Sequence, residues 1–319
     1  MGHGRFEFRR LRRQFRRPLR TGAGEVGSVD RILLRTEGPE GVGFGEVAPW
    51  PGFPVEPADA AEATLREAGG DLGRLRGIVG SRSTALPCLA AALSMARNWA
   101  AIARFGGGVP SAGLLDGGNG SAPTKLSEGF TTLKLKVAPG EGRAVADAVL
   151  AALPPGGRLR LDANGSLGPD EASEWAAFAR AEARIEFLEQ PLPARHPAYA
   201  RLGKDRIALD ESVANPASSP DAADWKGIVV LKPSMAGDWD DLEPWAADRR
   251  DRLVVSSAFE TAVGRQAALW LSDRLRPGRV GGFDTLGRFE EDGRELHAGG
   301  PVARGRADID WQAFWEGLP

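Results

Sequence analysis

The chain has 319 residues, with 43 Asp and Glu against 41 Lys and Arg, three His and one Cys. A single cysteine excludes an intramolecular disulfide, and three scattered histidines exclude a zinc site built on His and Cys ligands. Any metal chemistry must therefore use oxygen ligands. The length suggests about two domains, and a chain of this size buries most of the surface that its unfolded form exposes.

Positive charge is concentrated at the start of the chain, where residues 1–20 hold eight Arg against Glu7 alone. A basic arm that binds nucleic acid, an organelle transit peptide and a strand with a basic solvent face all fit this composition. The apolar residues have the spacing of an edge strand, namely Phe6, Phe8, Leu11 and Phe15. We favour the strand, closed by Pro18.

The charge and apolar patterns of the sequence predict the location and the partners of the protein. No second basic cluster of this density occurs, so we expect no nucleic-acid partner. No apolar run is long enough to span a bilayer, and the N-terminus lacks the pattern of a signal peptide. We therefore expect a cytoplasmic protein without a membrane partner.

The first hundred residues predict a small α+β domain. Antiparallel strands are expected at 29–36 and 42–47, on either side of a turn at Gly38-Pro39. Helices are expected near 57–69 and 85–104, where apolar residues recur at helical spacing.

From about residue 110, short apolar strands alternate with Ala-rich helices. Apolar runs lie at 112–115, 132–137, 158–161, 185–188, 206–209, 228–231 and 252–255, and helical stretches lie at 142–152, 170–181 and 261–274. This alternation predicts a parallel sheet, and six or more such units predict closure into a (β/α) barrel. The alternative, an open doubly wound sheet, would need a Gly-x-Gly-x-x-Gly after a strand, which is absent.

Charged or polar residues end successive strands at intervals of 26, 27, 21, 22 and 24 residues, namely Lys136, Asp162, Glu189, Asp210, Lys232 and Ser256. In a barrel these ends share one rim, which is where active sites lie. Three carboxylates without His or Cys suit Mg²⁺, which also relieves their mutual repulsion. The alternative for each acid is an ion pair with a neighbouring Lys or Arg.

Three lysines flank these acids. Lys134 and Lys136 share one face of their strand, and Lys232 ends a strand on the other side of the acids. A lysine beside other cations has its neutral form favoured and serves as a general base, while Mg²⁺ stabilises an enediolate. We therefore expect removal of a proton alpha to a substrate carboxylate; the alternative is that Lys-x-Lys is a solvated part of the strand.

Several segments together resemble the enolase superfamily, in its muconate-lactonizing-enzyme-like branch. They are residues 132–136 (TLKLK), 159–165 (LRLDANG), 185–192 (IEFLEQPL), 207–212 (IALDES), 230–233 (VLKP) and 256–261 (SSAFET), with 15–21 (FRRPLRT) and 43–49 (GFGEVAP) in the capping domain. Within the superfamily the chain is most similar to the o-succinylbenzoate synthases of menaquinone or phylloquinone biosynthesis. This closer likeness rests on residues 256–265, the short chain and the Arg160-x-Asp162 pair.

The resemblance spans nearly the whole chain and implies an α/β fold. The architecture would be a (β/α)7β TIM-like barrel at residues 107–285, preceded by an α+β capping domain at 1–106. Residues 286–319 would pack back on the capping domain.

The resemblance also implies a reaction, the loss of water from 2-succinyl-6-hydroxy-2,4-cyclohexadiene-1-carboxylate to give o-succinylbenzoate. The superfamily uses a Lys or His base with magnesium, so Asp162, Glu189 and Asp210 would hold Mg²⁺, with Mn²⁺ as a substitute. Lys136 would remove the proton and then protonate the hydroxyl that leaves from the same face. Lys232 would stay cationic on the opposite face, Lys134 and Arg160 would add positive potential near the ring carboxylate, and Asn164 would support the site from beside Asp162.

The succinyl arm of this substrate needs a second anion site. Ser256 and Ser257 precede a helix that begins near Glu260, and its backbone N–H groups would hold a carboxylate; the alternative is that the serines only cap the helix. Arg20 and Thr21 of the capping domain would close over the substrate.

Other reactions in the superfamily use the same residues. Dipeptide epimerases and N-acylamino-acid racemases use two opposed lysines, as Lys136 and Lys232 would be. Epimerases carry an Asp-x-Asp segment after the last strand, whereas this chain has Asp284-Thr285-Leu286. A catalytically idle barrel that serves as a binding protein would lack a ligand or a lysine, and all are present. We expect a small dicarboxylate as the substrate; the sequence does not indicate an oligomeric state.

Overall fold

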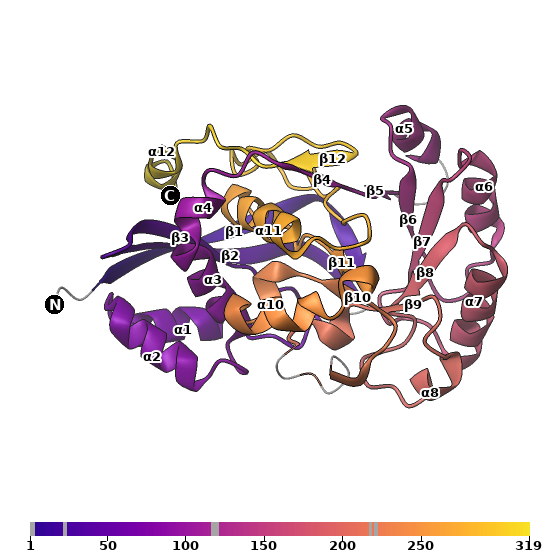
Figure 1. Cartoon of the computed structure of the whole chain (residues 1–319), viewed down its shortest axis with the longest axis horizontal. Coiled ribbons are helices and arrows are strands. Elements are labelled where there is room, and N and C mark those ends of the chain that lie inside the picture. The colour runs from indigo at the N-terminus through magenta and orange to yellow at the C-terminus, as the bar shows by residue number, and fades with distance from the viewer. Residues whose placement is uncertain (1–3, 22–23, 116–120, 217–218, 220–222) are drawn as a thin grey trace.

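An antiparallel sheet is followed by a parallel one in this computed structural model (Figure 1). The structure describes residues 4–21, 24–115, 121–216, 219 and 223–319. In Figure 1 the indigo strands of the first sheet lie above helices α1 and α2, and the strands of the second sheet lie beside α6 and α7 at the right.

The antiparallel sheet has three strands in the order β1-β2-β3. They are β1 (Arg5–Thr21), β2 (Gly24–Gly38) and β3 (Gly41–Val47). The Arg-rich start of the chain is therefore a strand, as predicted. Its apolar residues Phe6, Leu11 and Phe15 are buried, while Arg10 pairs with Asp30 and Glu62 near the surface.

Pro18 does not end β1, which differs from the prediction. The pairing of β1 with β2 shifts in register between Gln14 and Leu19 and then resumes. A residue without a backbone N–H is tolerated in such an irregular stretch of an edge strand, because no regular ladder bond is lost there.

Four helices follow the antiparallel sheet. They are α1 (Ala58–Ala68), α2 (Leu72–Ser81), α3 (Pro87–Arg97) and α4 (Trp99–Ile102). The helix predicted at 85–104 is thus divided at Asn98. Helix α3 lies directly against β3, and a Cβ on Gly45 would stand only 2.1 Å from the carbonyl oxygen of Ala92, so this approach requires glycine.

The parallel sheet has seven strands in the order β11-β10-β9-β8-β7-β6-β5. They are β5 (Gly113–Leu114), β6 (Thr132–Lys136), β7 (Arg158–Asp162), β8 (Ile185–Glu189), β9 (Ile207–Leu209), β10 (Ile228–Leu231) and β11 (Leu253–Val255). Parallel bridges from Gly281 to Ser111 and from Gly282 to Ser256 join one segment to both edges of the sheet. These contacts close the predicted (β/α)7β barrel.

Helices connect the barrel strands. They are α5 (Ala122–Ser127), α6 (Ala144–Ala152), α7 (Pro169–Ala181), α8 (Tyr199–Leu202), α10 (Trp239–Ala247) and α11 (Ala262–Leu275), with the 3-10 helices η2 (Glu211–Val213), η3 (Pro233–Met235) and η4 (Arg250–Arg252). Alternate strand residues form two cores. Phe187, Val230 and Val254 belong to a small cluster in the barrel interior, whereas Leu188 and Val229 belong to the large cluster that includes the helices.

The last segment of the chain returns to its beginning. Strand β12 (Val302–Arg304) pairs with β4 (Gly108–Pro110), and helix α12 (Trp311–Glu316) ends the chain. The rings of Phe15 and Phe289 stack at 4.3 Å, and those of Trp99 and Trp311 meet edge to face at 5.0 Å. We propose on these contacts that 286–319 belongs with the capping domain at 1–106 and that 107–285 forms the barrel domain.

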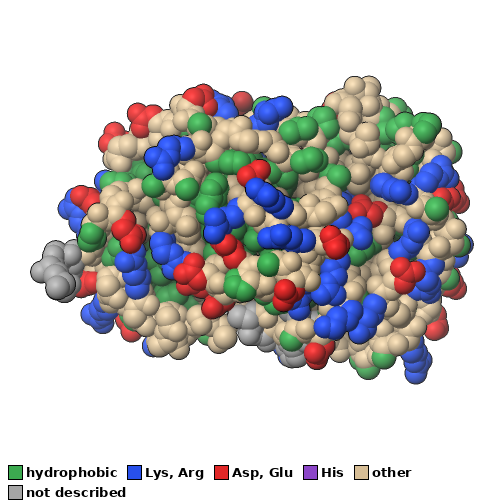
Figure 2. Space-filling view, in the orientation of Figure 1, with side chains coloured by type: hydrophobic (Ala, Val, Ile, Leu, Met, Phe, Trp, Pro, Cys, Tyr) green, Lys and Arg blue, Asp and Glu red, His purple; other side chains and the backbone are tan. Residues whose placement is uncertain are grey.

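Charges of both signs are mixed on the surface. On the face that Figure 2 shows, Lys and Arg side chains are interspersed with Asp and Glu side chains. No helix in the described ranges combines the length and the apolar character that crossing a bilayer requires.

Candidate active site

The residues predicted at the strand ends meet at the carboxyl-terminal end of the barrel. Four of them, Glu189, Asp210, Lys232 and Ser256, each follow by two positions a residue of the interior cluster, namely Phe187, Ala208, Val230 and Val254. Because side chains alternate along a strand, all four face the barrel interior. The strand order places the three acids between Lys136 on β6 and Lys232 after β10.

The three carboxylates are buried side by side. Asp162 pairs in register with Lys136 on one side and with Glu189 on the other. Asp162, Glu189 and Asp210 have relative exposures of 3%, 1% and 3%. Burial of like charges is unfavourable unless cations neutralise them.

Lys134 supplies part of that neutralisation. Its Nζ lies 2.9 Å from Asp162 Oδ2 and 2.8 Å from Glu189 Oε1. Burial alone would lower the pKa of Lys134, but the carboxylates of Asp162 and Glu189 outweigh it and raise that pKa above its usual value. Lys134 is therefore a fixed cation and not a base. These contacts place the Lys134 ammonium beside the acids, where positive potential was predicted.

Lys232 has two close partners. Its Nζ makes a short ion pair with Asp210 Oδ1. The ring of Phe53, from the loop after β3, covers the amine with its centroid 4.7 Å from Nζ. Lys232 thus contacts a carboxylate on one side and an aromatic face on the other.

Lys136 has different surroundings. Its side chain is exposed at the barrel mouth, and its Nζ donates to the neutral amide oxygen Oδ1 of Asn164 at 2.6 Å. The surrounding protein, together with the Lys134 ammonium, lowers the pKa of Lys136, although Asp162 opposes this effect. An amine with a lowered pKa is better able to accept a proton near neutral pH.

Asn164 connects this lysine to the acids. Its backbone N–H donates to Asp162 Oδ1 at 3.0 Å, and its Nδ2 donates to Glu211 Oε1 at 3.4 Å. The φ of Asn164 is 45°, in the left-handed region that asparagine tolerates better than most residues. Because Glu211 receives the amide NH2, the amide oxygen is turned toward Lys136. The predicted supporting position of Asn164 is thus matched by contacts on both sides.

The donor set at this rim suits a hard divalent cation. Asp162, Glu189 and Asp210 offer only oxygen atoms, the ligands that such a cation prefers. Burial, with repulsion from Asp162 and Asp210, raises the pKa of Glu189 to about 7 even beside Lys134. A buried Glu211 Oε2 also lacks a hydrogen-bond partner among the described residues. In their present positions, no three Asp, Glu, His or Cys side chains in the described ranges are close enough to hold one metal ion. The ammonium of Lys134 lies between the carboxylates of Asp162 and Glu189 and contacts both.

Arg160, which was predicted to add positive potential near the ring carboxylate, has its contacts inside the barrel. This residue faces the barrel interior two positions before Asp162, but its Nε donates to Glu186 Oε2 and its Nη2 to the carbonyl oxygen of Val280, each at 2.7 Å. Glu186 lies near the start of β8, at the opposite end from Glu189. Arg160 is 1% exposed. It therefore forms an internal ion pair and does not reach the rim.

The helix start predicted as an anion site already holds a protein carboxylate. Glu46 on β3 accepts from the backbone N–H groups of Thr261 and Gly264, each at 2.9 Å, and from the Thr261 hydroxyl at 2.6 Å. A Cβ on Gly264 would lie 2.8 Å from Glu46 Oε2. Helix α11 therefore binds the antiparallel sheet through its N-terminus, at the position predicted for a substrate carboxylate.

The two serines before α11 have separate partners. The Ser257 hydroxyl is buried, donates to Glu260 Oε2 at 2.6 Å and accepts from the Phe259 N–H at 3.0 Å. The Ser256 hydroxyl donates to the carbonyl oxygen of Gly282 at 3.1 Å. Neither serine caps α11, whose cap is Thr261. Ser256 keeps a partly exposed position at the rim, whereas Ser257 is committed to Glu260.

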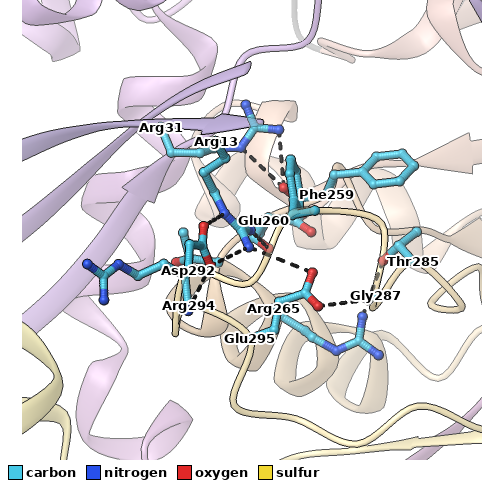
Figure 3. Close-up of polar contacts among 12 residues, drawn as sticks. Arg13, Arg31, Phe259, Glu260, Arg265, Thr285, Gly287, Asp292, Arg294 and Glu295 are labelled. Atoms are coloured by element: carbon cyan, nitrogen blue, oxygen red, sulfur yellow. Dashed lines mark hydrogen bonds and ion pairs between the residues drawn. The ribbon is translucent and has the colours of Figure 1, made fainter. Parts of the chain in front are cut away.

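Two arginines of the first sheet hold the loop between β11 and α11 (Figure 3). Arg31 donates to the carbonyl oxygens of Ala258 at 2.7 Å and Phe259 at 3.2 Å, and Arg13 donates to that of Glu260 at 3.3 Å. Both arginines are fully buried. Phe259 has a φ of 60°, so its backbone is strained and depends on these contacts.

The residues expected to close over the substrate show local contacts. The Thr21 hydroxyl donates to the carbonyl oxygen of Gly24 at 2.8 Å. Arg20 pairs with Glu25 through the strand register, and its side chain lies outside the described residues. Closure by Arg20 and Thr21 stays a prediction.

Sequence reasoning missed Phe53, Glu211 and the pair of Arg31 and Glu46. Glu211 follows Asp210 directly, and Glu46 lies in the GFGEVAP stretch, so both acids stood next to recognised residues. Nothing in the sequence pattern places Phe53 over Lys232, because this contact joins the loop after β3 to a strand end that is distant in the chain.

The comparisons by sequence and by structure match this chain to related proteins. A family model described as "Enolase C-terminal domain-like" matches residues 121–237. An o-succinylbenzoate synthase of Thermosynechococcus vestitus is 36% identical over 299 residues, which cover 88% of this chain and 92% of that protein. The crystal structure of an o-succinylbenzoate synthase from Thermosynechococcus elongatus BP-1, complexed with Mg in the active site, matches with a TM-score of 0.83 at 32% identity and covers 98% of this chain and 100% of that chain.

An epimerase has a similar structure but a lower sequence identity. The structure of a substrate-liganded complex of the L-Ala-D/L-Glu epimerase from Bacillus subtilis matches with a TM-score of 0.74 at 21% identity, covering 96% of this chain and 97% of that chain. At this identity the likeness shows a common fold alone.

Proposed function

We propose a function from the premise that this chain belongs to the o-succinylbenzoate synthase family of the enolase superfamily. The protein is a hydro-lyase that removes water from 2-succinyl-6-hydroxy-2,4-cyclohexadiene-1-carboxylate and forms o-succinylbenzoate. This reaction belongs to menaquinone or phylloquinone biosynthesis. The substrate is a small dicarboxylate, which agrees with a rim that carries three lysines.

One observation supports this reaction over epimerisation: the two flanking lysines are not equivalent. Lys232 is held by Asp210 and by the ring of Phe53, whereas Lys136 donates to the neutral amide of Asn164 and has a lowered pKa. An epimerase needs both lysines to exchange protons, one on each face of the carbon. A syn elimination needs one lysine that exchanges a proton and one that stays charged.

The proposed steps use Lys136 twice. Its neutral Nζ takes the proton from the carbon alpha to the ring carboxylate, and the negative charge moves onto that carboxylate. The bond between the ring and the hydroxyl oxygen then breaks on the same face. Lys136 returns its proton to the departing oxygen, so water leaves and the ring becomes aromatic. Lys232 stays protonated on the opposite face and stabilises the charged carboxylate.

Asp162, Glu189 and Asp210 would hold Mg²⁺, a proposal that their oxygen donors and their burial side by side support. When bound, the cation stabilises the negative charge that develops on the substrate carboxylate. We propose Mn²⁺ as a substitute because it accepts the same oxygen ligands. Lys134 would add positive charge beside the cation, and Asn164 would orient Lys136.

Three residues are candidates for contacts with the substrate away from the reacting carbon. Ser256 remains a candidate at the rim, and Arg20 and Thr21 remain candidates for closing the site from the capping domain. Arg160 and Ser257 are left out because their polar atoms already have internal partners. The cytoplasmic location and the absence of a nucleic-acid partner stay predictions.

The function is tested with two substrate classes in parallel. The purified protein with Mg²⁺ is incubated with the cyclohexadiene substrate, and the product is identified by mass and ultraviolet spectrum. The same protein is incubated in D2O with a panel of dipeptides, and alpha-deuteration is followed by NMR. Formation of o-succinylbenzoate without dipeptide exchange is the expected result. Dipeptide exchange without dehydration would assign the protein to the epimerases, and inactivity in both assays would favour an idle barrel.

A further inference from the structure

A concave site lies at the end of the barrel opposite the rim. It has a volume of about 720 Å³ and is lined by residues at or just before the starts of strands β6 to β11, together with Gly278 to Val280 of the closing segment. This volume is in the range of small-molecule sites, which is roughly 300–1,000 Å³. We call it the amino-terminal basin. The full length of the barrel strands separates it from Lys136 and the three carboxylates.

The amino-terminal basin gathers cations that have no acidic partner. Its lining includes Arg158, Lys204, Arg206, Lys226 and Arg252. Within the described ranges, the three arginines donate to backbone carbonyl oxygens: Arg158 to that of Ala183, Arg206 to that of Glu182 and Arg252 to that of Trp225. Among the described residues, none of the five cations forms an ion pair.

The acids of the basin do not offset this charge. Glu186 is already engaged by Arg160 at 2.7 Å and by Arg279 at 2.8 Å. Asp205 and Asp251 remain, so two acids face the five unpaired cations. Like charges held around one concavity repel each other, and a bound anion would relieve this repulsion.

We propose that the amino-terminal basin binds a diphosphate group, either as free pyrophosphate or as part of a nucleoside diphosphate. Guanidinium groups match the geometry of phosphate oxygens, and flexible lysines add point charges from the facing loops. The cations come from the starts of four different strands, so a single phosphate would reach only some of them. The polar lining also fits phosphate oxygens better than an apolar ligand. The site is separate from the one that the proposed reaction uses.

The first test is isothermal titration of the metal-free protein with pyrophosphate, ADP and orthophosphate in separate arms. Binding of pyrophosphate, with orthophosphate weaker, supports the proposal and indicates an inorganic source. Binding of ADP without pyrophosphate also supports a diphosphate site and indicates a nucleotide source. Failure of both ligands to bind would overturn the proposal.

Variants locate the site. Lys204→Gln combined with Lys226→Gln should weaken binding about tenfold or more, because it removes two cations that attract the diphosphate. Asp251→Asn should strengthen binding, since it removes a repelling carboxylate. The matched control, Arg74→Gln with Arg76→Gln, removes two exposed cations from α2 and should leave binding unchanged.

A variant of a rim lysine tests whether the diphosphate binds at the rim and not in the amino-terminal basin. Lys136→Ala should leave diphosphate binding intact, because Lys136 lies at the other end of the barrel. If Lys136→Ala abolished binding while the Lys204 and Lys226 variant still bound normally, the anion would lie at the rim and the proposal would be wrong. Circular dichroism confirms that each variant is folded.

Discussion

Two lysines flank the buried carboxylates, and their immediate contacts differ. Lys232 contacts Asp210 and the face of Phe53, so its charge is stabilised from two sides. Lys136 contacts an amide, and the neighbouring Lys134 ammonium disfavours a second positive charge. One residue therefore suits proton transfer, and the other suits stabilisation of a negative charge.

Lys136→Ala should lower kcat by about 10²–10⁴-fold, which is the usual contribution of a general acid–base group. Its carboxylate neighbours remain, so the variant should still bind Mg²⁺. Steady-state turnover measures the first effect, and calorimetric titration with Mg²⁺ measures the second. A variant that keeps wild-type turnover would remove Lys136 from the base role.

Phe53→Leu should lower kcat while the protein stays folded, because the leucine keeps apolar bulk but removes the ring face above Lys232. A cation–π contact is worth about 0.5–2 kcal/mol, which corresponds to roughly a 2- to 30-fold loss of rate. Phe53→Tyr keeps the ring and should restore most of the activity. Equal activity of the leucine and tyrosine variants would show that the ring face has no part in catalysis.

Helix α11 and strand β3 are coupled by a buried carboxylate. Glu46 satisfies N–H groups at the helix start, where a negative charge is favoured, and its Oε1 lies 3.7 Å from Arg31 Nε. Both side chains have 0% exposure. The same arginine holds the strained loop at Phe259, so this element pair fixes the loop that borders the rim.

Glu46→Ala should reduce the free energy of unfolding by about 3–5 kcal/mol, because it leaves Arg31 as a buried charge without its partner. Urea unfolding followed by circular dichroism measures the change. Glu37→Ala is the matched control: Glu37 pairs with Arg5 at the surface, where ion pairs contribute only about 0–1 kcal/mol. Similar losses for the two variants would contradict a special role for the buried pair.

The strand ends could be predicted because each charged residue ends an apolar run, and alternation turns it to the same face. Arg160 shows the limit of that argument. It is on the same interior face as Asp162, but its direction depends on Glu186 from the next strand. Helix α2 was missed because Gly73, Gly77 and Gly80 weaken its helical pattern.

At the scale of the whole molecule, the buried carboxylates and the amino-terminal basin lie at opposite ends of one barrel, and the last segment of the chain contacts its first strand. The family and the barrel could be predicted from ordered motifs. The contacts between distant segments could not, because they depend on how the capping strands lie over the barrel loops. His297 is one such contact: its Nε2 lies 3.0 Å from Oε1 of Gln266 on α11.

The stability of the folded protein should depend on pH through His297. Burial, with smaller contributions from Arg265 and Arg306, lowers the pKa of His297 from 6.5 to about 3. The unfolded chain therefore takes up a proton near pH 6.5 that the folded chain does not, so the free energy of unfolding falls as the pH falls. Between pH 6.5 and 5 this amounts to about 2 kcal/mol.

Urea unfolding at a series of pH values checks this prediction. His297→Gln should flatten the dependence between pH 6.5 and 5, because glutamine does not titrate and can still donate to Gln266. An unaltered slope in the His297 variant would place the titrating group elsewhere.

The position of the metal and the product ring tests the central claim most directly. It is measured in a crystal structure of the protein with Mn²⁺ and o-succinylbenzoate, with the metal located by anomalous scattering. We predict one metal site bound by Asp162, Glu189 and Asp210, with Lys136 and Lys232 on opposite faces of the product ring. A metal bound elsewhere, or a product ring that does not lie between the two lysines, would contradict the account.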